Sequence, residues 1–115
     1  MNETLANLAH EVEAALALDD ALAERVQEAL TDAIGAGIER AALDRTDDVL
    51  ALVSECRTGW SVSMEGVARQ PNGHWTCALR QSASRDDDEY LGVGRGPTLP
   101  HALLAALLKA LAYTG

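Results

Sequence analysis

The chain has 115 residues, with 18 acidic and 9 basic side chains and a formal net charge of −9 at pH 7. This length suits one domain with a core of its own. The acidic balance disfavours binding to nucleic acid, to anionic membranes and to other polyanions. Two cysteines are too few for a disulfide framework, so we expect Cys56 and Cys77 to be buried free thiols.

Targeting signals are not evident in the sequence. The first residues contain no basic region followed by an apolar run, which argues against a signal peptide. The apolar stretches are too short or too interrupted to cross a bilayer. Together with the free thiols, these features predict a cytoplasmic location and no membrane partner.

The first 43 residues predict two amphipathic helices, the first from Glu3 to Leu18. Apolar residues recur at helical spacing at Leu5, Leu8, Val12 and Leu16, and then at Leu22, Val26, Leu30 and Ile34. Asp19 and Asp20 begin the second helix, because acidic groups favour the positive end of a helix. The run Gly35-Ala36-Gly37 loosens or ends it, since each glycine costs about 1 kcal/mol relative to alanine inside a helix. Residues 38–43 predict one further turn or two.

From residue 44 the pattern is helix, three strands and helix. Polar residues at 44–48 offer caps for a helix that ends at Gly59. Period-two alternation predicts strands at residues 60–65, 75–80 and 90–95. The first two form a hairpin, because Pro71-Asn72-Gly73 favours a turn.

The final helix is the clearest feature of the sequence. Thr98 can cap it, and Pro100 falls in its first turn, where a missing N–H costs little. One half of its surface is leucine, at Leu99, Leu103, Leu104, Leu107, Leu108 and Leu111. The other half is mostly alanine, and Lys109 is the one residue there that is certainly charged. A helix this apolar must be covered on more than one side.

These elements predict an α+β fold. Residues 44–115 form an α-β-β-β-α two-layer sandwich, in which helices lie on one face of a three-stranded antiparallel sheet. Residues 1–43 form an N-terminal helical extension. We expect these helices to cover the alanine half of the last helix, from the same chain or from a second copy, and we therefore expect a homodimer.

Four segments carry a resemblance to a known family: 46–53, 59–63, 73–77 and 97–111. With a helix ending in Gly-Trp, a tryptophan-bearing hairpin and an alanine/leucine closing helix, residues 44–113 resemble the small phage-borne "ABA sandwich" domain. The resemblance implies a phage or prophage origin. It implies no activity, and it carries no catalytic residues to transfer.

Two further likenesses are weaker. The run Gly96-x-Thr98-Leu99-x-x-Ala102-Leu103 is similar to the strand-to-helix junction of HicB-type antitoxins, although the chain lacks their proline-rich loop. The αβββα order is similar to that of double-stranded-RNA-binding domains. Those domains need lysines at the start of the last helix, where this chain has Pro97, Leu99 and Pro100, so RNA binding by that route is disfavoured.

Two motifs invite a functional interpretation. Gly92-x-Gly94-x-Gly96 before a helix could hold a phosphate, but glycines also let a strand pass close to a helix or a tryptophan, and we favour the second interpretation. Asp86-Asp87-Asp88-Glu89 could gather a divalent cation, but it lacks the alternation and glycine of a calcium loop. We interpret it as a solvated acidic loop.

Other side chains give weaker signals. His74, His101, Cys77 and Cys56 could form a zinc site, but no closely spaced ligand pair supports it. Trp60 and Trp75 could stack on a base, although they more often anchor a core that lacks phenylalanine. We therefore predict no catalytic, cofactor-binding or metal-binding residues and no cofactor.

The leading functional hypothesis is a non-enzymatic module that acts through protein–protein contacts or self-association, without nucleic acid. The alternative is an antitoxin-like or regulatory module that acts on a toxin or on nucleic acid. Nothing in the sequence supports an enzyme.

Overall fold

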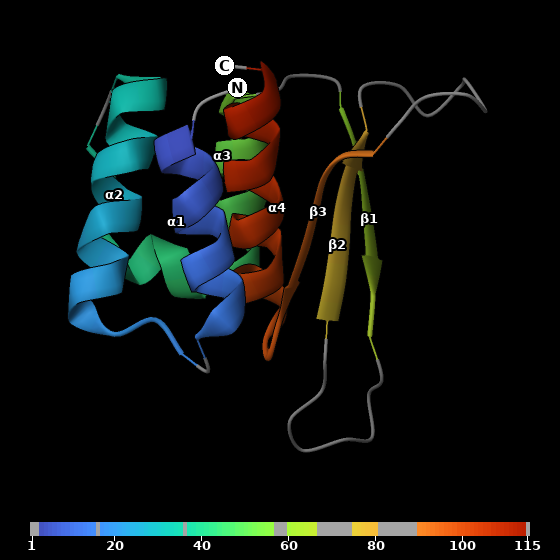
Figure 1. Cartoon of the computed structure of the whole chain (residues 1–115), viewed down its shortest axis with the longest axis horizontal. Helices are drawn as coiled ribbons and strands as arrows, with labels where there is room; N and C mark the ends of the chain where they lie inside the picture. The colour runs from blue at the N-terminus through green and yellow to red at the C-terminus, as the bar shows by residue number, and fades with distance from the viewer. Residues whose placement is uncertain are drawn as a thin grey trace.

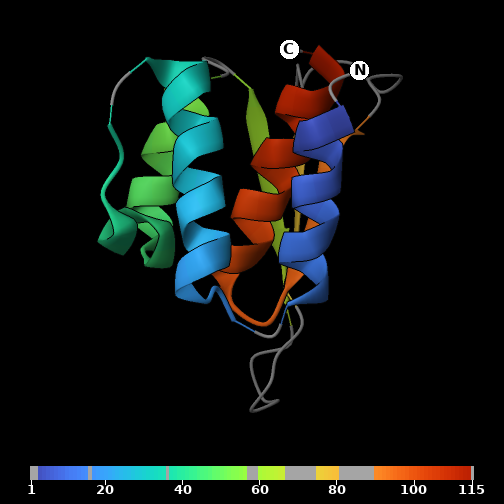
Figure 2. The ribbon, with the colours of Figure 1, turned by 60° about the vertical axis from the view of Figure 1, so that its left-hand side comes forward.

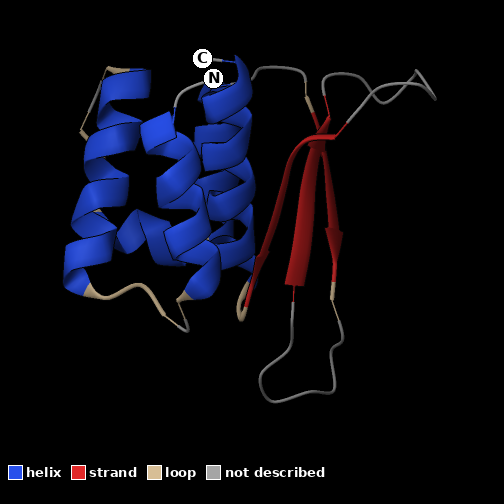
Figure 3. Cartoon of the chain, viewed as in Figure 1, coloured by secondary structure: helices blue, strands red, loops and turns tan. Residues whose placement is uncertain are grey.

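The computed structural model describes residues 3–15, 17–35, 37–56, 60–66, 75–80 and 90–114. The elements in chain order are α1 (Glu3–Ala14), α2 (Asp20–Ile34), the 3-10 helix η1 (Arg40–Asp44), α3 (Thr46–Cys56), β1 (Ser61–Glu65), β2 (Trp75–Arg80), β3 (Tyr90–Gly96) and α4 (Leu99–Thr114). The helices pack on one side of an antiparallel sheet of strand order β1-β2-β3 (Figures 1 and 3). The predicted α+β class is confirmed.

Helix α4 lies at the centre of the core, between the sheet and the other helices (Figure 1). Every side chain from His101 to Leu108 is buried, on the alanine half as well as on the leucine half. The sheet and α3 contact α4, and α1 lies along it, as Figure 2 shows. No described helix is both long enough and apolar enough to span a bilayer.

The alanine half of α4 is covered by the same chain. Ala102, Ala105 and Ala112 are buried, and Leu8 and Val12 of α1 belong to the same hydrophobic cluster. Val26 and Leu30 of α2 are buried in that cluster too, and α2 packs against α1, η1 and α3. The sequence left open whether this cover comes from the same chain or from a second copy, and in the structure it comes from the same chain. A homodimer therefore needs some other surface.

The glycines of β3 allow α4 to approach the sheet closely. A Cβ atom at Gly92 would lie 2.2 Å from the Ala106 carbonyl oxygen, and one at Gly94 would lie 2.3 Å from the Ala106 nitrogen. A Cβ at Gly96 would meet the ring of His101 at 2.6 Å. The packing interpretation of this glycine run is confirmed, because strand backbone and helix backbone are in direct contact there.

The register of the sheet separates its two faces. Trp75, Cys77 and Leu79 of β2 lie beside Gly96, Gly94 and Gly92 of β3, on the face toward α4. Val62 and Met64 of β1 continue that face, opposite Leu79 and Cys77. Successive side chains of a strand point to opposite faces, so Ser61, Ser63 and Glu65 belong to the outer face.

Local capping chemistry explains three of the helix ends. The Asp19 carboxylate accepts a hydrogen bond from the Leu22 N–H at 2.7 Å. Gly35, with φ +83°, donates its N–H to the Thr31 carbonyl and ends α2. The Thr98 hydroxyl accepts from the His101 N–H at 3.4 Å at the start of α4. These ends are placed as the sequence predicts.

Helix α1 ends at Ala14, four residues before the predicted Leu18, so its predicted length was wrong. The Leu18 carbonyl is instead held by the Arg40 guanidinium at 3.0 Å. Residues 38–43 were predicted to form a turn or two, and a short 3-10 helix occurs there, at Arg40–Asp44.

Candidate functional site

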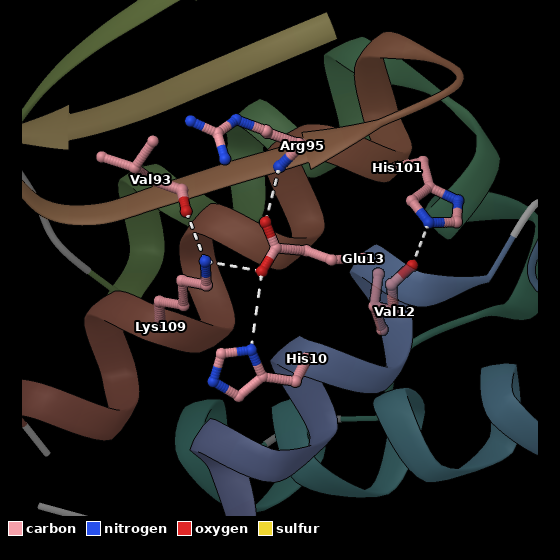
Figure 4. A network of polar contacts seen from close by, with 7 residues as sticks. All are labelled: His10, Val12, Glu13, Val93, Arg95, His101 and Lys109. Atoms are coloured by element: carbon pink, nitrogen blue, oxygen red, sulfur yellow. Dashed lines mark hydrogen bonds and ion pairs between the residues drawn. The ribbon is translucent and has the colours of Figure 1, made fainter. Parts of the chain in front are cut away.

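The free edge of β3 is occupied by side chains of α1 and α4 (Figure 4). The Arg95 N–H donates to Glu13 Oε2 at 3.1 Å, and Lys109 Nζ donates to the Val93 carbonyl oxygen at 2.7 Å. These two backbone groups therefore need no further strand. We call Glu13, Lys109 and the Val93 and Arg95 backbone groups the β3-edge cluster.

An ion pair joins the two side chains of the β3-edge cluster. Lys109 Nζ lies 2.6 Å from Glu13 Oε1, and the two side chains are only 22% and 18% exposed. His10 Nδ1 lies 3.9 Å from the same carboxylate oxygen, from an exposed position on α1. Both oxygens of Glu13 thus accept bonds from within the chain. The arrangement is a structural clamp that holds α1 and α4 against the edge strand.

A second polar contact lies at the start of α4. Nε2 of the buried His101 is hydrogen-bonded to the Val12 carbonyl oxygen (Figure 4). Beside it is a cavity of about 110 Å³, lined by Ala17, Leu18, Leu43, Asp44, Pro97, Thr98 and His101. The contact ties the last turn of α1 to the first turn of α4, so we assign His101 a structural role.

The two cysteines differ in environment. Cys77 is fully buried, and its Sγ lies 3.9 Å from the Leu99 carbonyl oxygen. Burial raises the pKa of the Cys77 thiol to about 11, so it is protonated at neutral pH and a poor nucleophile. Cys56, at the end of α3, is only partly buried, so the prediction that both thiols are buried was wrong for Cys56. Cys56 is the last residue of α3, so no further turn of that helix covers it.

The remaining sequence candidates lie partly outside the described residues. His74, the Asp86–Glu89 run and the Pro71–Gly73 turn lie outside the described residues. Within the described ranges, no group of three or more histidine, cysteine and acidic side chains could hold a metal ion. Trp60 and Trp75 are half-buried and pack against the core.

The opposite edge of the sheet belongs to β1. In the described part of the chain, β1 pairs with β2 and with no other strand. The backbone groups along its other edge therefore pair with no described strand. Met64 is 41% exposed, the one large exposed hydrophobic side chain there. Val62 is half-buried on the same face, while Ser63 and Glu65 are exposed on the outer face. We call this backbone and these side chains the open edge.

Sequence reasoning found neither the β3-edge cluster nor the open edge. Lys109 gave a usable signal, because a lysine in an otherwise apolar helix needs a partner. Glu13 gave none, since it resembles any solvent-exposed glutamate of an amphipathic helix. Comparisons with protein families, with curated proteins and with solved structures find no match for this chain.

Proposed function

We propose that the chain is a non-enzymatic interaction module that binds a protein partner by strand addition at the open edge. A phage-related origin is part of the proposal and rests on the resemblance of residues 44–113. The observation that carries the proposal is the contrast between the two edges of the sheet. The β3 edge is occupied by Glu13 and Lys109, whereas no described element pairs with the outer edge of β1.

An unpaired edge strand presents a row of N–H and C=O groups that can pair with another strand. Proteins that prevent such pairing place charges at inward-facing positions of the edge. In β1 the inward-facing positions are Val62 and Met64, both apolar. These side chains favour a strand that receives a partner over one that repels it.

The strongest candidates for chemistry are accounted for by the fold. The Cys77 thiol is buried and protonated at neutral pH, and the His101 ring is bonded to the Val12 carbonyl. The glycines before α4 serve backbone contact with that helix. These roles support the non-enzymatic assignment.

The experiment is a screen of displayed peptides of about ten residues, long enough to pair with all of β1. The backbone amide resonances of the protein are then recorded with each binder. We expect the largest shifts at residues 61–65. Met64→Lys, which places a charge on the inward face, should abolish binding, whereas Ala21→Lys adds the same charge at an exposed position of α2 and should preserve it.

Peptides that bind elsewhere, or equally well to the Met64→Lys protein, would contradict the proposal. The antitoxin-like alternative predicts a different partner for the chain. The net charge of −9 disfavours binding to nucleic acid. In that alternative, the partner that could bind at the open edge is therefore a toxin protein.

A further inference from the structure

We infer that the partner at the open edge is a second copy of this chain, paired antiparallel through β1 about a two-fold axis at Ser63. This inference rests on the proposed docking function of the open edge. A symmetric interface uses the same surface twice, so β1 must be complementary to its own reversed sequence. The five residues Ser61-Val62-Ser63-Met64-Glu65 meet that condition.

The register follows from the length of β1 and from the face of the sheet to which each of its side chains points. If both helical layers lie on the same side of a continuous sheet, each residue of one copy lies opposite a residue of the other copy whose side chain points to the same face of the sheet. Centring the axis on Ser63 pairs all five residues, whereas centring it on Val62 or on Met64 pairs only three. Centring it on Glu65 would place two carboxylates directly opposite each other, which is destabilising.

The side chains agree with the Ser63-centred register on both faces. Toward the helices, the exposed Met64 of one copy lies opposite the half-buried Val62 of the other, so two apolar side chains cover each other. On the outer face, Glu65 of one copy lies opposite Ser61 of the other. Ser61 is itself opposite Arg80 in the β1–β2 ladder, so each carboxylate falls in the same row as an arginine of the second copy.

The helical layers leave room for this arrangement. Helix α1 packs beside β3, the strand at the other edge of the sheet, and α2 lies beyond α1 (Figure 1). Two copies joined through β1 therefore carry these two helices at the outer ends of a continuous six-stranded sheet.

The interface is small, and the two copies repel each other. The interface pairs five residues per copy, whereas a standard interface has about 20–30 residues on each side. We therefore expect a weak, reversible dimer. Each copy carries a formal charge of −9, and salt screens that repulsion. Dimerisation should therefore become at least about threefold tighter between low and physiological salt, where the Debye length falls to about 8 Å. A basic partner would show the opposite trend.

The register is tested by cysteine cross-linking of the full chain in a Cys56→Ser background, which removes the half-buried thiol. Ser63→Cys places two thiols directly opposite each other, with Cα atoms about 4.5–5.5 Å apart, a separation that a disulfide can span. We expect it to form a covalent dimer under mild oxidation. Ser61→Cys is the matched control on the same strand and face, and it should link at least about tenfold more slowly, because it opposes Glu65.

A mixture of the Ser61→Cys and Glu65→Cys proteins should link to each other, which a random collision would not favour. Sedimentation of the wild-type chain from about 10 μM to about 1 mM should show a reversible dimer that Met64→Lys abolishes. Equal cross-linking of Ser61→Cys and Ser63→Cys would overturn the register. A wild-type monomer over the whole range would overturn the second copy as partner, while the peptide screen above still decides separately whether the open edge binds a strand.

Discussion

Lys109 Nζ lies 2.6 Å from Glu13 Oε1, and the two side chains also hold the Val93 carbonyl and the Arg95 N–H of β3. Replacing Lys109 with methionine should lower the free energy of unfolding by about 2 kcal/mol, because the Glu13 carboxylate keeps little access to water. Urea denaturation measures the loss. A Glu13→Leu, Lys109→Met double variant should be more stable than the sum of the single losses implies, since neither charge is then left without its partner. Strict additivity would show that the pair contributes nothing.

The glycines of β3 make a sharp prediction about one methyl group. Gly94→Ala should cost about 3 kcal/mol or more, because the new Cβ would lie 2.3–2.4 Å from the Ala106 nitrogen and the Ala102 oxygen. Gly37→Ala is the control, since nothing lies within 4 Å of its Cβ position, and it should be neutral or slightly stabilising. Thermal denaturation of the two variants compares them directly. Equal melting temperatures would show that the strand and the helix are not in close contact.

Cys77 should make the protein less stable at alkaline pH. Its pKa is raised from 9.0 to about 11 by burial, so between these pH values the unfolded chain loses a proton that the native state keeps. Stability therefore falls as the pH rises through this window, by up to about 3 kcal/mol at about 1.4 kcal/mol per pKa unit. Urea denaturation from pH 8 to 11 measures the slope. A Cys77→Ala protein with the same slope would contradict this assignment.

The two thiols should also differ in reactivity. Cys77 should react with a thiol reagent only when the protein unfolds, whereas the partly buried Cys56 should react in the native state. Mass spectrometry of the labelled peptides distinguishes the two sites. Fast native labelling of Cys77 would place its strand elsewhere than beneath α4.

Helix α2 carries four exposed acidic residues at intervals of four, at Asp20, Glu24, Glu28 and Asp32. Like charges at this spacing destabilise a helix, so Glu28→Lys should raise the free energy of unfolding by about 0.5–1 kcal/mol. It replaces two repulsive pairs with two attractive ones. Glu28→Gln should give about half the effect, and both gains should shrink in high salt. Urea denaturation at two salt concentrations tests this.

Local chemistry made much of the fold predictable. Asp19, Gly35 and Thr98 begin or end helices through contacts within a few residues, and their positions agree with the sequence pattern. The glycine run was interpreted correctly for a different reason: an alanine-rich helix follows a strand that lacks Cβ atoms at alternate positions, which favours close packing of the two over a phosphate site. The early end of α1 was missed, because Leu18 is held by Arg40 from a later segment.

The candidate site depends on relationships that a sequence pattern does not contain. Whether β1 or β3 keeps a free edge is decided by where α1 packs, and nothing within either strand encodes that position. Glu13 becomes an edge-strand partner only because α1 lies along α4 and beside β3. The partial exposure of Cys56 likewise depends on how far the helical layer covers the end of α3.

The close contact between β3 and α4 also limits how this protein can evolve. The atoms that a Cβ at Gly92 or Gly94 would meet first belong to the backbone of α4, not to its side chains. A second substitution on α4 cannot make room, because Ala102 and Ala106 have almost no side chain left to remove. A suppressor of Gly94→Ala must therefore act at a distance, by letting the whole helix move away from the sheet. Such suppressors should map to α1 and α3, the helices that pack against α4.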